Sequence, residues 1–180
     1  MRSIHTHPKP FMNRVAHYGA AALLVVMVVA AVAQIALAVV DERARLLFLG
    51  GVFTLLLALP VLMLTTLTPA LTVQPEGLTI TPIVWKPIWV GWDAVKAVKD
   101  YPLLPPPDTE SGRKLLAGAK RYRKAEGKML VIPSLPTPYR IGGLFCGEGL
   151  TPVIAFTSRS HTDYDKLLKK ILIYTEEAAP

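Results

Sequence analysis

Two long stretches of the sequence contain no charged residue, and only a short loop separates them. They span residues 15–40 and 46–74, with Asp-Glu-Arg-Ala-Arg at positions 41–45 between them. A helix of about 20 apolar residues is long enough to cross a bilayer, and a connection this short makes consecutive helices antiparallel neighbours. The sequence therefore predicts a transmembrane hairpin over residues 14–70, with helices at about 14–40 and 45–67.

The distribution of Lys and Arg predicts the side on which the termini lie. Arg2 and Lys9 in the tail of residues 1–13, followed by Arg14, precede the first span. Lys and Arg beside a span mark the cytoplasmic side, although Arg43 and Arg45 in the loop reduce the contrast. We expect a two-span protein of the cell (inner) membrane with both termini and the soluble domain in the cytoplasm.

A basic tail before an apolar run is also typical of a secretory signal peptide. Ala31-Val32-Ala33 resembles the small-residue cleavage site of such a peptide. The first run is longer than an ordinary signal-peptide core, however, and a second span follows at once. We therefore interpret the first run as a retained helix.

The first span opens with small residues. Small side chains let helices approach closely in lipid, so we expect this end to pack against the second span or a partner. Gln34 is strongly polar and lies deep in the run, and we expect its side chain to bond across the helices or to a backbone carbonyl. The small residues are Ala16, Gly19, Ala20, Ala21 and Ala22.

Residues 71–180 have the length and pattern of one small β-rich domain. Alternating or β-branched residues, separated by turn residues, predict short strands. Apolar positions at helical spacing predict an amphipathic helix over 163–175, whereas Gly142-Gly143 and Gly147-x-Gly149 predict turns. The strands are expected at 71–73, 78–81, 83–85, 88–90, 129–132 and 151–157.

The order of these features resembles the bacterial pleckstrin-homology-like (PH-like) domains that a transmembrane hairpin anchors. The residues that carry the resemblance are Leu-Thr-Val-x-Pro-Glu-Gly-Leu-Thr-Ile, Val-Gly-Trp-Asp-Ala-Val-Lys-Ala-Val, Phe-Thr-Ser-Arg and Asp-Tyr-Asp-Lys-Leu-Leu, in that order. The resemblance implies a membrane α-helical hairpin plus a small α+β domain, in which a C-terminal helix caps a curled antiparallel sheet. It implies no catalytic residues. Residues 100–128, which are Pro-rich and then basic, depart from this pattern as an insertion.

We find no motif that predicts an enzyme or a bound cofactor. The sequence contains no phosphate-binding Gly loop, no metal-spaced Cys/His set and no nucleophile elbow. The one cysteine, Cys146, cannot form an intramolecular disulfide and is expected to be a buried thiol. We therefore expect no catalytic residues, no metal and no cofactor.

The histidines give weak alternatives to this prediction. His5-x-His7 supplies only two metal ligands, in a Pro-flanked tail. His17, at the edge of a span, is expected to be an interfacial side chain, but it is also the one candidate ligand for a haem or chlorophyll metal. His161 is expected to belong to the cap before the last helix.

A basic stretch and two tryptophans are the candidate binding residues. Lys and Arg near a membrane attract anionic lipid, and Trp favours both the headgroup region and protein contacts. Nucleic acid is not an expected partner, because the chain has no aromatic-basic RNA signature. The candidates are Arg113, Lys114, Lys120, Arg121, Arg123, Lys124, Lys128, Trp85 and Trp89.

These features favour a non-enzymatic, membrane-anchored binding or scaffolding module. Its expected partners are membrane lipids and other membrane-protein subunits, which would make it an accessory subunit of a larger complex. One alternative is a PH-like domain that senses anionic lipid through the basic stretch. A second alternative is a pigment- or haem-associated subunit of an energy-transducing complex.

Overall fold

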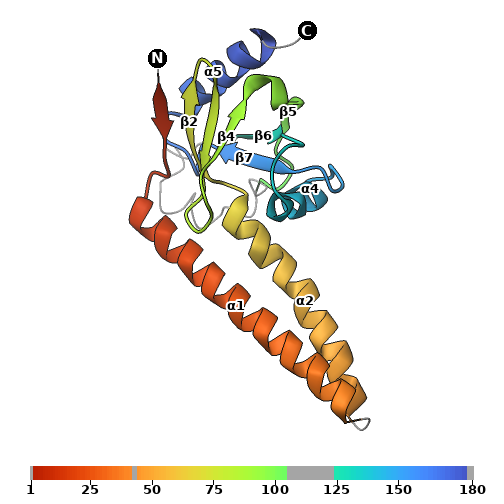
Figure 1. Ribbon diagram of the computed structural model, residues 1–180. Coiled ribbons are helices and arrows are strands. Elements are labelled where there is room, and N and C mark those ends of the chain that lie inside the picture. The colour runs from red at the N-terminus through yellow and green to blue at the C-terminus, as the bar shows by residue number, and fades with distance from the viewer. Residues whose placement is uncertain (1, 42–43, 105–123, 178–180) are drawn as a thin grey trace.

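The computed structural model describes residues 2–41, 44–104 and 124–177. It consists of a stalk of two long helices beneath a small α+β domain (Figure 1). The insertion predicted at 100–128 falls largely outside the described residues. The same is true of five predicted binding residues, namely Arg113, Lys114, Lys120, Arg121 and Arg123.

The stalk is the predicted antiparallel hairpin, formed by α1 (Pro10–Val40) and α2 (Arg45–Thr66). Both helices are long and apolar enough to cross a membrane. The first helix begins at Pro10 rather than Arg14, because Pro has a φ angle suited to the first helical turn and lacks the N–H that would stay unpaired there. The second helix continues through Pro60 to the domain.

The two helices approach closely near the loop and diverge toward the domain (Figure 1). A Cβ atom added at Gly51 would lie 2.6 Å from Ile35 Cγ1 and 2.9 Å from the Ala31 carbonyl oxygen, and one added at Gly50 would lie 2.7 Å from Gln34 Oε1. By contrast, a Cβ atom at Gly19 would meet nothing within 4 Å. Gly19 therefore makes no close contact with α2, whereas Gly50 and Gly51 of α2 lie close to α1 at the helix crossing; packing of the first turns of α1 against a partner stays a prediction.

A four-stranded antiparallel sheet joins the two ends of the hairpin. Its order is β1-β2-β3-β4, and β1 (Ser3–His5), which precedes the hairpin, pairs with β2 (Ala70–Gln74), which follows it. The N-terminal tail thus contains an edge strand. The sheet continues with β3 (Gly77–Thr81) and β4 (Ile88–Gly91), whereas residues 83–85 form a bend and not the predicted strand.

A three-stranded antiparallel sheet completes the β structure, so the domain has two sheets rather than one continuous curled sheet. A short 3-10 turn, η2 (Trp92–Ala94), leads from β4 into it, and the strand order is β5-β6-β7. The strands are β5 (Ala97–Asp100), β6 (Gly127–Val131) and β7 (Val153–Thr157).

Alternate side chains of β6 and β7 enter two different apolar clusters, so this sheet is covered on both faces. Leu130, Ile154 and Phe156 face the first sheet and α5 (Tyr164–Glu177), whose buried face is Tyr164, Leu167 and Ile171. The other face packs on the end of α2; this cluster contains Leu67, Met129, Val131, Cys146, Val153 and Ala155. The capping helix and the buried thiol are as predicted.

One predicted turn is a helix. Gly142 and Gly143 lie inside α4 (Arg140–Phe145), which follows the 3-10 turn η3 (Thr137–Tyr139). An added Cβ at Gly143 would overlap the Thr151 carbonyl, so these glycines allow close packing rather than a chain reversal. The other pair is a turn as predicted, and Gly147 and Gly149 have φ angles of 82° and 60°.

Candidate functional site at the turn before the last helix

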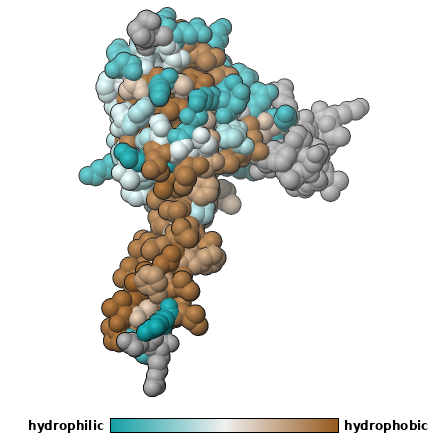
Figure 2. Space-filling view, turned by 90° about the vertical axis from the view of Figure 1, so that its right-hand side faces the viewer, coloured by the Kyte–Doolittle hydropathy of each residue, from teal (hydrophilic) through white to brown (hydrophobic). Residues whose placement is uncertain are grey.

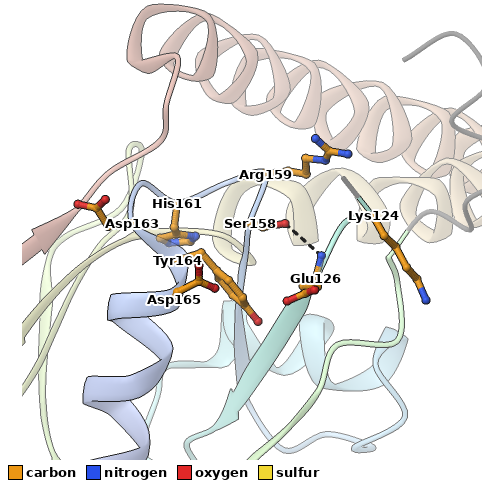
Figure 3. A pocket seen from close by; sticks show the side chains of 8 residues that line it. All are labelled: Lys124, Glu126, Ser158, Arg159, His161, Asp163, Tyr164 and Asp165. Carbon is orange, nitrogen blue, oxygen red and sulfur yellow. Dashed lines mark hydrogen bonds between the residues drawn. The ribbon is translucent and has the colours of Figure 1, made fainter. Parts of the chain in front are cut away.

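An open hollow surrounds the turn between β7 and α5. Its polar lining comes from three places: the residues before β6, the turn itself and the first turn of α5. The Ser158 hydroxyl accepts a hydrogen bond of 3.1 Å from the Glu126 N–H, which holds two of these places together (Figure 3). The lining residues are Lys124, Glu126, Ser158, Arg159, His161, Asp163, Tyr164 and Asp165.

Arg159 connects this hollow to the N-terminal segment. Its side chain extends from the turn toward the helical hairpin (Figure 3), and it also lines a second hollow with His7, Pro8 and Lys9. Arg14 lies one turn further along, in a hollow between the start of α1 and the β3–β4 loop. Cationic side chains therefore gather where the hairpin enters the domain.

A hydrogen-bond network lies beneath the turn. The His161 ring places Nε2 2.8 Å from the Pro69 carbonyl oxygen and Nδ1 2.9 Å from Ser160 Oγ. Because a carbonyl oxygen can only accept, Nε2 carries the proton and Nδ1 accepts from the hydroxyl. Burial lowers the pKa of His161 to about 4, the bond to Pro69 opposes that shift, and neighbouring His5 and His7 add to it.

The Ser160–His161 pair resembles a nucleophile beside a base, but its surroundings favour a structural role. Ser160 Oγ accepts a hydrogen bond of 3.1 Å from the Thr157 N–H and lies 2.8 Å from Thr157 Oγ1. His161 is only 2% exposed. Both groups therefore serve to fix the turn that leads from β7 into α5.

His5 ties the N-terminal strand to the same turn. Its Nδ1 donates a hydrogen bond of 2.9 Å to the Thr162 carbonyl, and the Thr162 N–H donates one of 2.9 Å to the Thr6 carbonyl. His5 is 3% exposed, so it is part of the fold rather than of a mobile metal-binding tail. No group of three or more potential ligands among the described His, Cys, Asp and Glu residues is placed to hold a metal.

The described members of the predicted binding set do not form one site. Lys124 is exposed and lines the hollow, whereas Lys128 lies in β6 and forms a 2.7 Å ion pair with Asp100. Lys9 and Arg159, which line the adjoining hollow, are not in the predicted set. The basic tail was the available signal, but only the hydrogen bonds that join His5 and Thr6 to Thr162 place that tail beside the turn that follows β7.

The two candidate tryptophans also have separate positions. The Trp85 Nε1–H donates a hydrogen bond of 3.0 Å to Thr65 Oγ1 in the last turn of α2. Trp89 is 60% exposed and stands on the outer face of the first sheet. The register places it at one end of a row across the four strands, in which the other members are Ile4, Thr72 and Thr79.

His17 lies near the start of α1 and its side chain is buried, and its expected position at the membrane interface stays a prediction. Its Nδ1 donates a hydrogen bond of 2.8 Å to the Asn13 carbonyl one turn earlier in α1. Nε2 is therefore the ring nitrogen that a haem or chlorophyll metal would take. The pigment alternative stays a prediction.

Comparisons with protein-family models, curated proteins and solved structures find no significant match.

Proposed function

We propose that this chain is a non-enzymatic binding or scaffolding module anchored in the cell membrane, and an accessory subunit of a larger membrane complex. The hairpin spans the membrane, and the domain and both termini lie in the cytoplasm. The apolar helices support the anchor. The hydrogen bonds that hold the Ser160–His161 pair in the turn support a structural rather than a catalytic role for these two residues.

The observation that carries the proposal is that the hairpin and the domain form one structural unit. Strand β1 enters α1, and α2 leads into β2, so both ends of the hairpin belong to one sheet. The Leu67 carbonyl at the end of α2 accepts a hydrogen bond of 2.7 Å from the Ala155 N–H in β7. A domain held this firmly presents one fixed surface to its neighbours, as a scaffold requires.

We also propose that the domain is PH-like. Two small antiparallel sheets enclose a core that the amphipathic α5 caps, which is the arrangement that the resemblance implies in its coarse outline. The hairpin separates the first strand from the other six strands within the described ranges. This insertion supports a domain built around its anchor rather than one attached by a linker.

The row that ends in Trp89 is the surface we assign to the partner subunit. Exposed aromatic side chains contribute strongly to protein interfaces, and Ile4 at the other end of the row is 58% exposed. Thr79 between them is half-buried and Thr72 is buried, so the exposed side chains of the row are those at its two ends. We assign these exposed ends to contact with another membrane-protein subunit on the cytoplasmic side.

Affinity purification from native membranes tests the proposal. The tagged full chain, cross-linked before detergent extraction, is expected to retain another membrane protein at constant stoichiometry. Trp89→Ser is expected to reduce that recovery several-fold, whereas Ile173→Ser, which alters a side chain that is 42% exposed on α5, serves as the matched control. Recovery of this chain alone, with the wild type and with both variants, would contradict the subunit proposal.

The cationic residues at the junction favour a second candidate function, recognition of anionic lipid. Each Lys or Arg near an anionic surface contributes on the order of 1 kcal/mol, and Lys9, Arg159 and Lys124 line adjoining hollows. Phosphatidylglycerol retained through purification of the full chain can be measured by mass spectrometry. We expect Lys9→Gln with Arg159→Gln to reduce it, and Lys166→Gln with Lys169→Gln on α5 to leave it unchanged.

A further inference from the structure

Part of α2 does not contact the domain. If the proposed membrane anchor is correct, the length of that part sets the distance between the domain and the membrane surface. Met63 and Leu67 at the end of α2 pack into the apolar cluster of the domain. Residues 45–62 remain, and at about 1.5 Å per residue they measure about 27 Å. The hydrocarbon core of a bilayer is about 30 Å thick. The base of the domain must therefore reach the membrane boundary.

Helix α4 lies beside this end of α2. A Cβ atom added at Gly142 would be 3.3 Å from the Leu67 side chain, so the glycine face of α4 packs directly on the helix end. Figure 1 shows α4 at the level of the uppermost turns of α2. Gly142 thus lets α4 pack on the Leu67 side chain, while Gly143 packs on the Thr151 carbonyl.

Apolar side chains are exposed at the C-terminal end of α4 and in the loop that follows it. Leu144 is 49% exposed, Phe145 is 40% exposed and Leu150, in the loop that follows, is 63% exposed. Figure 2 shows that the hydrophobic surface of the stalk continues onto the underside of the domain. Arg140, exposed at the start of α4, can extend its charged end to the headgroups while its stem stays among apolar groups.

We propose that the edge formed by Leu144, Phe145 and Leu150 is embedded in the boundary between headgroups and acyl chains of the leaflet that the hairpin enters. The domain then rests directly on the membrane instead of standing above it. Amphipathic segments at this depth bury apolar side chains while their polar groups stay hydrated. Lipid of that leaflet is expected to cover this edge, because the adjoining end of α2 lies at the same membrane boundary.

Fluorescent labelling of single cysteines in the full chain tests this inference. Cys146 is buried, and burial with nearby Glu148 raises its pKa to about 11, so it stays largely unlabelled at pH 7. The Leu150→Cys variant is labelled at the new cysteine with the environment-sensitive dye NBD. It is then reconstituted into phosphatidylcholine vesicles that contain doxyl-labelled lipid. Leu49→Cys, at a 65% exposed position of α2, is the membrane control, and Lys166→Cys on α5 is the aqueous control.

We expect the dye at position 150 to emit at shorter wavelength than at 166 and to be quenched by shallow doxyl groups. Aqueous emission at 150 with lipid quenching at 49 overturns this inference and leaves the anchor intact. Aqueous emission at positions 150 and 49 overturns the proposed membrane anchor as well. Blue-shifted emission at 150 that lipid-borne doxyl groups do not quench shows that a protein covers the edge, which also overturns the inference.

Discussion

His161 donates a hydrogen bond of 2.8 Å to the carbonyl oxygen of Pro69, across 92 positions of the sequence. Pro69 lies in the short connection between α2 and β2, and His161 lies in the turn before α5. One buried imidazole thus joins the exit of the proposed membrane segment to the C-terminal cap of the domain. The contact stabilises both the stalk junction and the turn that lines the hollow.

This histidine makes the stability of the protein depend on pH. Burial lowers its pKa from 6.5 to about 4 in the folded state, so between these values the unfolded chain binds more protons. Stability is therefore complete above about pH 6.5 and falls as the pH drops toward 4. The expected loss is about 3 kcal/mol, because one pKa unit corresponds to about 1.4 kcal/mol.

Thermal unfolding in detergent between pH 7 and pH 4.5, followed by tryptophan fluorescence, measures this loss. In His161→Gln the amide can still donate to Pro69 but does not titrate, so we expect a lower midpoint at pH 7 and a flatter pH dependence. All other titratable groups are common to both proteins. An equal slope for wild type and variant would mean that His161 is not the group responsible.

The features predicted correctly from the sequence are those encoded over a few neighbouring residues. Uninterrupted apolar runs indicated α1 and α2, and the 3.6-residue spacing around Leu167 and Ile171 indicated α5. The bend at 83–85 was mistaken for a strand because β-branched and aromatic residues also occur in loops that pack on another element. Trp85 there bonds to Thr65 instead of joining a sheet.

The features that were missed depend on contacts between distant segments. Ser3–His5 is too short to show a strand pattern in the sequence. It becomes a strand because the edge of β2 is available to pair with it. The position of Arg159 beside Lys9 follows from the hydrogen bonds that join His5 and Thr6 to Thr162 in the turn after β7. His161 was assigned to a cap, and its bond to Pro69 could not be read from sequence spacing.

Alanine at the helix crossing is expected to destabilise the hairpin. In Gly51→Ala the new methyl group meets Ile35 and the Ala31 carbonyl at less than contact distance, so the helices must move apart. Overpacking of this kind costs about 1–3 kcal/mol. Gly19→Ala is the matched control, because that position is open and alanine favours a helix by about 0.5–1 kcal/mol. Unfolding in dodecyl sulfate measures the stability of both variants. Equal stability changes in the two would contradict close packing of the helices at Gly51.

Loss of the His5 ring is expected to loosen the N-terminal strand. His5→Ala removes the donor to the Thr162 carbonyl and leaves space in a buried site, at a cost of about 1–3 kcal/mol. Amide hydrogen exchange in β2 should then accelerate, since β2 bonds to β1. In His7→Ala, where Nδ1 bonds only to the Lys9 backbone nearby, exchange in β2 should stay unchanged. Protection of β2 that is the same in both variants would show that β1 does not depend on His5.

Substitution by Phe should have different effects at two tryptophans three positions apart: it should lower stability at Trp92 and partner binding at Trp89. Trp92 stacks on Tyr174 with ring centres 5.4 Å apart, and its Nε1–H donates to the Gln74 carbonyl at 3.0 Å. Trp92→Phe removes that donor, which is expected to cost about 1–3 kcal/mol of unfolding free energy. Trp89→Phe, at a 60% exposed position, should change the unfolding free energy by less than about 0.5 kcal/mol while weakening recovery of a partner subunit. A large loss of stability in Trp89→Phe would instead assign that ring to the fold and remove it from the proposed docking surface.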